Sequence, residues 1–176
     1  MFVRRARINC YLLLPLVLTF LSACKTNSNN PEKQLALLRI HLEATSDGTP
    51  FTQSVEVVRA HPVLLNVDKT PILTEADVSE AKLLDVPGGF VMQIQFDRHG
   101  TFALEQYSTA NLSRHIAIFS EFGNKPVQTR WLAAPLFTRP VHKGVLTFTP
   151  DANLHEAEEI VRGLNNVAAE IRKKSR

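Results

Sequence analysis

The chain has 176 residues, with 20 Lys and Arg side chains against 17 Asp and Glu side chains and a formal net charge of +3. Arg4, Arg5 and Arg7 lie in the first 23 positions, which contain no acidic residue, so the other 153 positions carry 17 basic and 17 acidic residues. This balance argues against a nucleic-acid-binding surface, which needs an excess of Lys and Arg. The length suits one domain with a substantial hydrophobic core, alone or with a small appendage.

The first 23 residues have the three parts of a secretory signal peptide. Arginines precede an apolar run over Tyr11–Phe20, and small residues follow before Cys24. The apolar run is about ten residues long, whereas a membrane-spanning helix needs about 20. We therefore expect residues 1–23 to be a cleaved signal peptide. A permanent transmembrane anchor and a signal peptide without lipid attachment are the alternatives.

The segment Leu21-Ser22-Ala23-Cys24 resembles the lipobox of bacterial lipoproteins. In that family the cysteine thiolate accepts diacylglycerol, and the cysteine becomes a new N-terminus that carries acyl chains such as palmitate. The resemblance implies lipidation at Cys24 and a lipid anchor in the bacterial cell envelope. Residues 24–32 are mostly polar and predict a flexible tether. Lys25 follows the cysteine. By the sorting rule of lipoproteins in enteric bacteria, a residue other than aspartate at this position favours the periplasmic side of the outer membrane over the inner membrane.

Cysteine usage agrees with this interpretation. The only other cysteine, Cys10, lies inside the expected signal peptide. With Cys10 removed and Cys24 lipidated, no thiol remains for a disulfide bond, a metal site or a nucleophile.

The first part of the chain after the tether predicts three strands from alternating or β-rich residues. They cover residues 38–43, 54–59 and 62–67. The dipeptide Asp47-Gly48 and Pro50 mark a turn between the first two strands. We therefore expect these two strands to pair as a hairpin with a longer loop.

Thr74 and Asp77 have the spacing of a capping box, which predicts a short helix with Val78 and Ala81 on its inner side. The segment Pro87-Gly88-Gly89 predicts a turn. After it comes the clearest strand of the chain, residues 90–96, in which apolar and polar residues alternate. Its apolar face comprises Phe90, Met92, Ile94 and Phe96.

The remaining segments predict a helix, three strands and a final amphipathic helix. In chain order these are a helix over 101–109, strands over 115–119, 127–136 (interrupted at Pro135) and 144–148, and a last helix capped by Asp151 or Asn153. The apolar stripe of the last helix comprises Leu154, Ala157, Val161, Leu164, Ala168 and Ile171. We expect this stripe to pack on the sheet, with a seam for a partner helix as the alternative. The whole order predicts one α+β domain over residues 33–176, with a mixed or antiparallel sheet and two or three helices packed on it.

The order of these predicted helices and strands, and the turns between them, resemble the head part of the first periplasmic domain of SecD, in the SecDF protein-export family. The resemblance covers about residues 63–164. The matching pieces are Thr70–Thr74 with Asp77 and Ala81, Val91–Phe96 through Gly100 to Phe102, Thr109–Ile118, Pro135, Gly144–Phe148 and Ala157–Leu164. Two turns depart from the family: Ser120–Gly123 replaces an Asp-Gly turn, and Pro140–Gly144 replaces a Gly-Gly pair. The resemblance implies a fold and a surface that faces polypeptides. It does not imply the proton-driven work of SecD, because no transmembrane helix is predicted after the signal peptide.

The polar residues predict no catalytic, cofactor or metal site. The six histidines are His41, His61, His99, His115, His142 and His155, and no two of them have the spacing of a metal motif. The triplet Asp97-Arg98-His99 follows a strand and precedes a glycine, so we interpret it as a solvated turn. An envelope enzyme that uses Asp97 and His99 is the alternative.

Two aromatic residues, Phe122 and Trp131, are candidate contacts for a protein partner. The alternatives are core packing for Trp131 and a plug inside a loop for Phe122. The sequence therefore predicts a membrane-anchored envelope lipoprotein that is not an enzyme, that needs no cofactor and no nucleic acid, and that binds an envelope protein or an exported polypeptide. A structural lipoprotein, or a subunit of an envelope complex that assembles through exposed strand edges, is the second interpretation.

Overall fold

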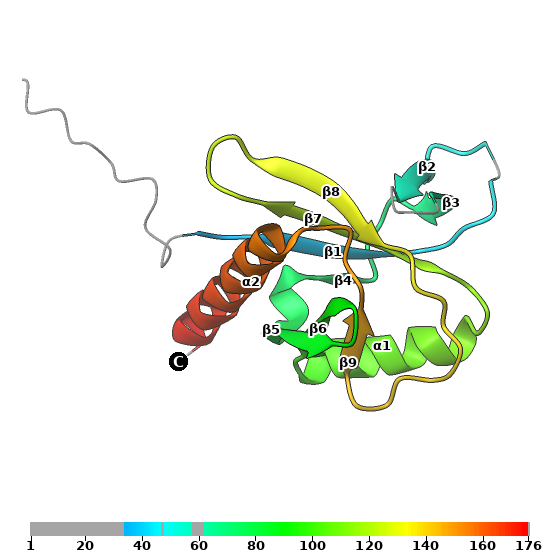
Figure 1. Cartoon of the computed structure of the whole chain (residues 1–176). Coiled ribbons are helices and arrows are strands. Elements are labelled where there is room, and N and C mark those ends of the chain that lie inside the picture. Colours follow the sequence, from blue (N-terminus) through cyan, green and yellow to red (C-terminus); the bar gives the residue numbers. More distant parts are fainter. Residues whose placement is uncertain (1–33, 47, 58–61, 176) are drawn as a thin grey trace, which may run out of the picture.

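The structure is a computed structural model that describes residues 34–46, 48–57 and 62–175 (Figure 1). The predicted signal peptide, the tether, Cys24 and His61 lie outside the described residues. The elements in chain order are β1 (Leu37–Leu42), β2 (Thr52–Val57), β3 (Val63–Asp68), β4 (Leu73–Thr74), the 3₁₀-helix η3 (Glu75–Asp77), β5 (Val78–Val86), β6 (Gly89–Phe96), α1 (Arg98–Ala110), β7 (Ile116–Phe122), β8 (Gln128–Ala133), β9 (Val145–Phe148) and α2 (Leu154–Lys174).

The strands form three small sheets. The largest has the order β4-β1-β7-β8, the second has the order β5-β6-β9, and β2 pairs with β3 alone. Every one of these pairs is antiparallel. Together with two α-helices, this confirms the predicted α+β class.

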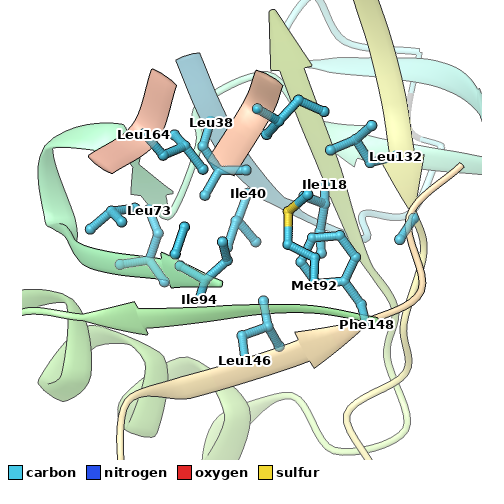
Figure 2. Packing of buried hydrophobic residues seen from close by; sticks show 14 of the residues in the cluster. Leu38, Ile40, Leu73, Met92, Ile94, Ile118, Leu132, Leu146, Phe148 and Leu164 are labelled. Atoms are coloured by element: carbon cyan, nitrogen blue, oxygen red, sulfur yellow. The ribbon is translucent and has the colours of Figure 1, made fainter. Parts of the chain in front are cut away.

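The main hydrophobic core lies between the two larger sheets, and both helices contribute to it. Figure 2 shows Ile40 and Ile118 of the larger sheet facing Met92 and Ile94 of the smaller one. All four side chains are fully buried, as is Leu164 of α2. This layering explains the alternation in β1 and β6, because one face of each strand points into the same core.

The hairpin β2–β3 packs on the opposite face of the larger sheet. Its inward side chains, Val55, Leu65 and Val67, form a second buried cluster with Ala117 of β7. Trp131 of β8 packs against this cluster. The larger sheet is therefore covered on both faces.

The predicted hairpin between residues 38–43 and 54–59 is wrong. The first of these strands, β1, pairs with β4 and β7, and the second, β2, pairs with β3. β1 carries buried side chains toward both faces, among them Ile40 toward the main core and His41 toward the hairpin. Such a strand needs partners on both edges and cover on both faces, which a local hairpin does not supply.

The predicted short helix after Thr74 is also wrong, although the capping box is present. The side chain of Thr74 accepts from the backbone N–H of Ala76, and the carboxylate of Asp77 accepts from the backbone N–H of Thr74 at 2.9 Å. The helix lasts only for the 3₁₀ turn η3, because Val78–Val86 then pairs along β6 as the strand β5. The cap therefore tightens a corner between two strands.

Three other boundaries differ from the prediction. α1 starts three residues early, at Arg98, because the Asp97 side chain caps it by accepting from the backbone N–H of Gly100 at 2.8 Å. The triplet Asp97-Arg98-His99, which we interpreted as a solvated turn, is therefore the start of α1. β7 runs on to Phe122, and β8 ends at Ala133.

The final helix is confirmed, with Asn153 and not Asp151 as its N-cap. Its buried side is turned slightly from the predicted stripe. Leu154 and Ile171 at the two ends are exposed, whereas Ile160 is fully buried in the main core. The middle of the helix packs on β5 and the larger sheet as expected. Among the described residues, no helix has the length and apolar character that crossing a membrane requires.

Candidate functional site

Of the two predicted contact residues, Phe122 is buried. Its side chain is only 1% exposed, at the end of β7, and the guanidinium carbon of Arg130 lies 6.0 Å from its ring centroid. The prediction that Phe122 is an exposed aromatic is therefore wrong. The reason is strand parity, since Phe122 continues the inward face of β7 that starts with Ile116 and Ile118.

Trp131 is half-buried beside the second cluster. Its ring centroid lies 5.3 Å from that of His41 in an edge-on arrangement and 5.2 Å from that of Phe119. Aromatic pairs at these separations are mutually attractive. Trp131 thus serves packing, with part of its surface left open to solvent.

His41 lies at the contact between the hairpin and the larger sheet. It is 4% exposed, and its Nδ1 lies 2.8 Å from the backbone carbonyl oxygen of Asp68 in β3. Because a carbonyl oxygen only accepts, Nδ1 carries the proton and donates. Burial lowers the pKa of His41, and the Arg39 charge adds to this, although the bond to Asp68 opposes both. The lowered pKa favours the neutral form of His41 at neutral pH, and its bond to Asp68 joins the hairpin to the larger sheet.

The fold also brings together Asp77, Asp97 and His99. One ligand-type atom of each lies within 4.8 Å of the others, and Nδ1 of His99 lies 2.8 Å from Oδ1 of Asp77. Both carboxylates are already engaged as caps, of η3 and α1. His99 is 80% exposed and lines neither of the pockets described next. The three side chains join η3 to the start of α1. The two caps and the bond between His99 and Asp77 account for their close approach.

Two pockets share Gly123 as a lining residue, and we call the pair the Gly123 groove. The apolar pocket has a volume of about 260 Å³, and the polar pocket has a volume of about 520 Å³. The apolar pocket is lined by Leu35, Ala36, Leu37, Glu121, Phe122, Gly123 and Val127. The polar pocket is lined by Gln34, Gly123, Asn124, Lys125, Pro126, Gln128, Asn153, His155, Glu156, Glu159 and Arg162.

Three parts of the chain build the groove: the approach to β1, the loop between β7 and β8, and the first turns of α2. Gly123 leaves β7 with φ = +84°, a conformation that favours glycine, and the loop follows from it. Leu35 is 46% exposed and Val127 is 52% exposed, so the apolar pocket has open aliphatic walls. The capping box between Asn153 and Glu156 fixes the first turn of α2.

Gln34 is the unusual residue of the polar pocket. It is 3% exposed, and its Nε2 atom has no hydrogen-bond partner among the described residues. Its backbone is fixed, since Nδ2 of Asn166 donates to the Gln34 carbonyl oxygen at 2.8 Å. Leaving a buried donor unpaired costs about 1–3 kcal/mol. The Nε2 atom itself has almost no accessible surface, so this donor is closed off from the open part of the pocket.

The charges of the polar pocket are partly paired. The guanidinium of Arg130 contacts both carboxylate oxygens of Glu156 at 3.0 Å. Partial burial alone would raise the pKa of Glu156, but the backbone N–H of Asn153 and the Arg130 charge together hold that pKa below its ordinary value. Glu156 therefore stays ionised and paired. The charges of Lys125, Arg162 and Glu159 are left facing the pocket.

Sequence reasoning did not find this groove. Gln34 stands at the boundary of the predicted tether, and Lys125 and Val127 stand in a predicted turn or strand end. None of them belongs to a motif. They meet only because β1 pairs with β7, from Leu37 opposite Glu121 onward, and because α2 crosses the same end. Phe122, which the sequence did single out, forms part of the groove wall from beneath.

Comparisons with known proteins bear on the fold. No protein family matches the sequence, and no curated protein matches it either. Among solved structures, the chain is similar to SecDF, described as a membrane component that enhances protein export, with 17% identity and a TM-score of 0.53 over 76% of this chain. It is likewise similar to SecDF in a super-membrane-facing form, with 17% identity and a TM-score of 0.55 over 76% of this chain.

The chain spans 63% of the first of these SecDF chains and 19% of the second. The similarity confirms the predicted SecD-like α+β fold for most of the described residues. At 17% identity it speaks to the fold alone. In its described part, this chain therefore has the fold of one portion of SecDF.

Proposed function

We propose that this protein is a lipid-anchored lipoprotein of the bacterial envelope whose SecD-like domain binds a protein partner or an exported polypeptide without catalysing a reaction. The observation that carries this proposal is the Gly123 groove, an apolar pocket with open aliphatic walls and a polar pocket that share Gly123 as a lining residue. Polypeptides present apolar side chains and hydrogen-bonding groups in alternation, and such a groove accommodates both.

The anchor is the second part of the proposal. The lipobox at Leu21–Cys24 supports a diacylglycerol on Cys24, and Lys25 supports the periplasmic side of the outer membrane. Residues 25–33 would then separate the lipid from Gln34 by at most about 30 Å when fully extended. The groove would be held close to the membrane surface, because Gln34 both lines the polar pocket and begins the described chain.

A link to protein export is the third part. The support is the shared fold with SecDF, which enhances protein export. A binding domain of this fold, held at a membrane, would meet polypeptides as they cross the envelope. No part of the proposal requires the proton-driven work that the transmembrane helices of SecD perform.

Photocrosslinking in living cells tests the binding function. A photoreactive amino acid at Val127 probes the apolar pocket, and one at Lys125 probes the polar pocket. Phe102 is the matched control, because it is 69% exposed on α1 and outside the groove. We expect adducts from the two groove positions and not from the control. Adducts to many exported chains or to translocon components would support export. A folded, lipidated protein that gives no groove adduct would contradict the proposal.

The anchor has its own test. Cells fed labelled palmitate should label the protein, and Cys24→Ser should abolish the label and release the chain from the membrane fraction. Equal labelling of the variant would overturn lipidation at Cys24.

A structural role in an envelope assembly is the second candidate. The observation that favours it is strand β8, which forms one edge of the larger sheet. Unpaired strand edges can join a second chain. Sedimentation of the lipidated protein in detergent distinguishes the two functions, since assembly through edges predicts stable oligomers and peptide binding does not.

A further inference from the structure

We infer that the C-terminal end of α2 binds the anionic phospholipid headgroups of the membrane that holds the protein, and that this contact orients the domain. This end comprises residues 170–176, of which the structure describes 170–175, and we call it the basic end of α2. The inference rests on the lipid anchor of the proposed function and adds a second membrane contact to it. Four observations lead to it.

The first observation is an uneven distribution of charge. Residues 170–176 hold four of the 17 basic residues that follow residue 23, but only one of the 17 acidic residues, Glu170. The side chains of the basic end therefore have a net charge of +3, and those of residues 24–169 have a net charge of −3. An anionic surface attracts the first part of the molecule and repels the second, so it favours one orientation of the domain.

The second observation is that the basic end is open to solvent. Residues 170–175 are all exposed, because Ala168 is the last residue of α2 that is buried in the core, and Figure 1 shows the helix projecting beyond the sheets. Within the part of the chain that the structure describes, Lys173 and Lys174 form no ion pair. Basic residues in a last turn also complement the helix dipole, and that role leaves their ammonium groups available to a phosphate.

The third observation is an apolar side chain among these charges. Ile171 is 38% exposed, and Lys174 lies three residues further on, on the same side of the helix. Helices that bind membrane surfaces combine apolar side chains, which enter the headgroup region, with Lys and Arg, which bind phosphates. The exposed Ile171 therefore favours a lipid surface over an acidic protein as the partner of the basic end.

The fourth observation is the place where the predicted tether joins the domain. Nδ2 of Asn166 donates to the backbone carbonyl oxygen of Gln34 at 2.8 Å, so the described chain begins beside α2. Lys174 follows Asn166 by eight residues, which is a rise of about 12 Å along the helix. An extended tether from Cys24 reaches about 30 Å, so the basic end can touch the headgroups while the acyl chains stay inserted. The anchor also keeps the basic end at a high local concentration near the membrane, so a weak contact suffices.

The contact has a consequence for the proposed binding of polypeptides. The residues of α2 that line the polar pocket lie between positions 153 and 162, in the opposite half of the helix. A domain held by both Cys24 and the basic end leaves that half of α2 free of the headgroups and open to a partner.

An environment-sensitive fluorophore tests the inference with the full-length, lipidated protein in phospholipid nanodiscs. Nitrobenzoxadiazole is attached to the thiol of Ser175→Cys, beside the basic charges, or to that of Glu56→Cys, at an exposed position of the hairpin β2–β3. The nanodiscs contain either phosphatidylcholine alone or its mixture with anionic phosphatidylglycerol. We expect the emission at position 175 to shift to the blue and to become at least about twice as strong with the anionic lipid, because headgroups exclude water from the probe. The probe at position 56 should not respond.

The double variant Lys173→Gln, Lys174→Gln removes two charges and keeps a similar helix propensity. Each basic residue near an anionic surface strengthens binding about fivefold, so this variant should lose most of the response. The control variant Lys82→Gln, Lys143→Gln changes the net charge equally at exposed positions elsewhere, and it should keep the response. Salt at about 0.5 M should also abolish the response, since it screens exposed charges.

An anchored protein whose probe at position 175 responds equally to both lipid mixtures would overturn the membrane contact and leave the anchor and polypeptide binding intact. A full response in the double variant of Lys173 and Lys174 would overturn it too. A photocrosslink from position 175 to an acidic envelope protein, without a response to phosphatidylglycerol, would assign the basic end to a protein partner instead. A wild-type chain that does not stay with the nanodiscs would overturn the anchor and the inference together.

Discussion

The guanidinium of Arg130 holds both carboxylate oxygens of Glu156 at 3.0 Å and so joins β8 to the first turn of α2. The same guanidinium donates to the backbone carbonyl oxygen of Asp151 at 3.0 Å. The Glu156 side chain is 14% exposed and that of Arg130 is 34% exposed, so water screens the pair only in part. Glu156 of this pair lines the polar pocket of the Gly123 groove.

Replacing Glu156 by Gln should lower the free energy of unfolding by about 1–2 kcal/mol, because Gln keeps the capping box but loses the two charge-assisted bonds. Urea denaturation measures the change. Glu158→Gln, at an exposed position of the same helix, should change stability by less than about 0.5 kcal/mol. A Glu156→Gln variant as stable as the wild type would show that the pair contributes nothing.

The contribution of Glu156 should disappear in acid. Its folded-state pKa lies below the ordinary glutamate value, so the carboxylate stabilises the protein above that value. As the pH falls through the folded-state pKa, the carboxylate takes up a proton and the contribution is lost. The difference in unfolding free energy between wild type and Glu156→Gln should therefore shrink below about pH 4. A difference that is constant from pH 7 to pH 3 would contradict this.

His41 predicts a second dependence on pH, nearer to neutrality. Burial lowers its pKa in the folded state, so the unfolded chain binds a proton more readily. Stability should be complete above the ordinary histidine pKa of about 6.5 and should fall as the pH drops below it. Chemical denaturation at pH 7.5 and pH 5.5 measures the loss. His41→Gln can still donate to Asp68 but cannot titrate, and it should lose less stability over this interval.

Gly163 predicts a steric effect. A Cβ atom at this position would lie 2.6 Å from the backbone nitrogen of Ala36 and 2.7 Å from its Cβ. Gly163→Ala should therefore lower stability by about 1–3 kcal/mol, although alanine alone favours a helix by about 1 kcal/mol. Thermal unfolding measures the change, with Glu170→Ala as the exposed control on α2. A more stable Gly163→Ala variant would mean that α2 does not approach the start of β1 so closely.

The sequence predicted those elements whose local pattern and burial agree. Residues 90–96 alternate, and the structure buries Met92, Ile94 and Phe96 in the main core. α2 has both a cap and a stripe, and it too was predicted. Local sequence patterns failed to predict the secondary structure where pairing with a strand distant in the sequence determines it. The capping box at Thr74 is real, but pairing with β6 converts the following residues into a strand.

The groove shows the same limit. Phe122 was singled out because it is aromatic and stands beside a turn, yet its strand parity buries it. Gln34 lines the polar pocket and is buried, and nothing in the residues around it in the sequence indicates that its amide is buried. Only the approach of α2 to the residues before β1, which Gly163 permits, encloses it.

The central position of β1 has a consequence for how the protein is made. Ile40 is paired with Leu73 on one side and with Ile118 on the other, so the strand nearest the start of the described chain waits for a partner that is synthesised much later. A chain that emerges N-terminus first leaves one edge of this apolar strand unpaired until β7 has followed, and long-range pairing of this kind is slow. During that interval the open edge of β1 is a site at which the unfinished chain can aggregate.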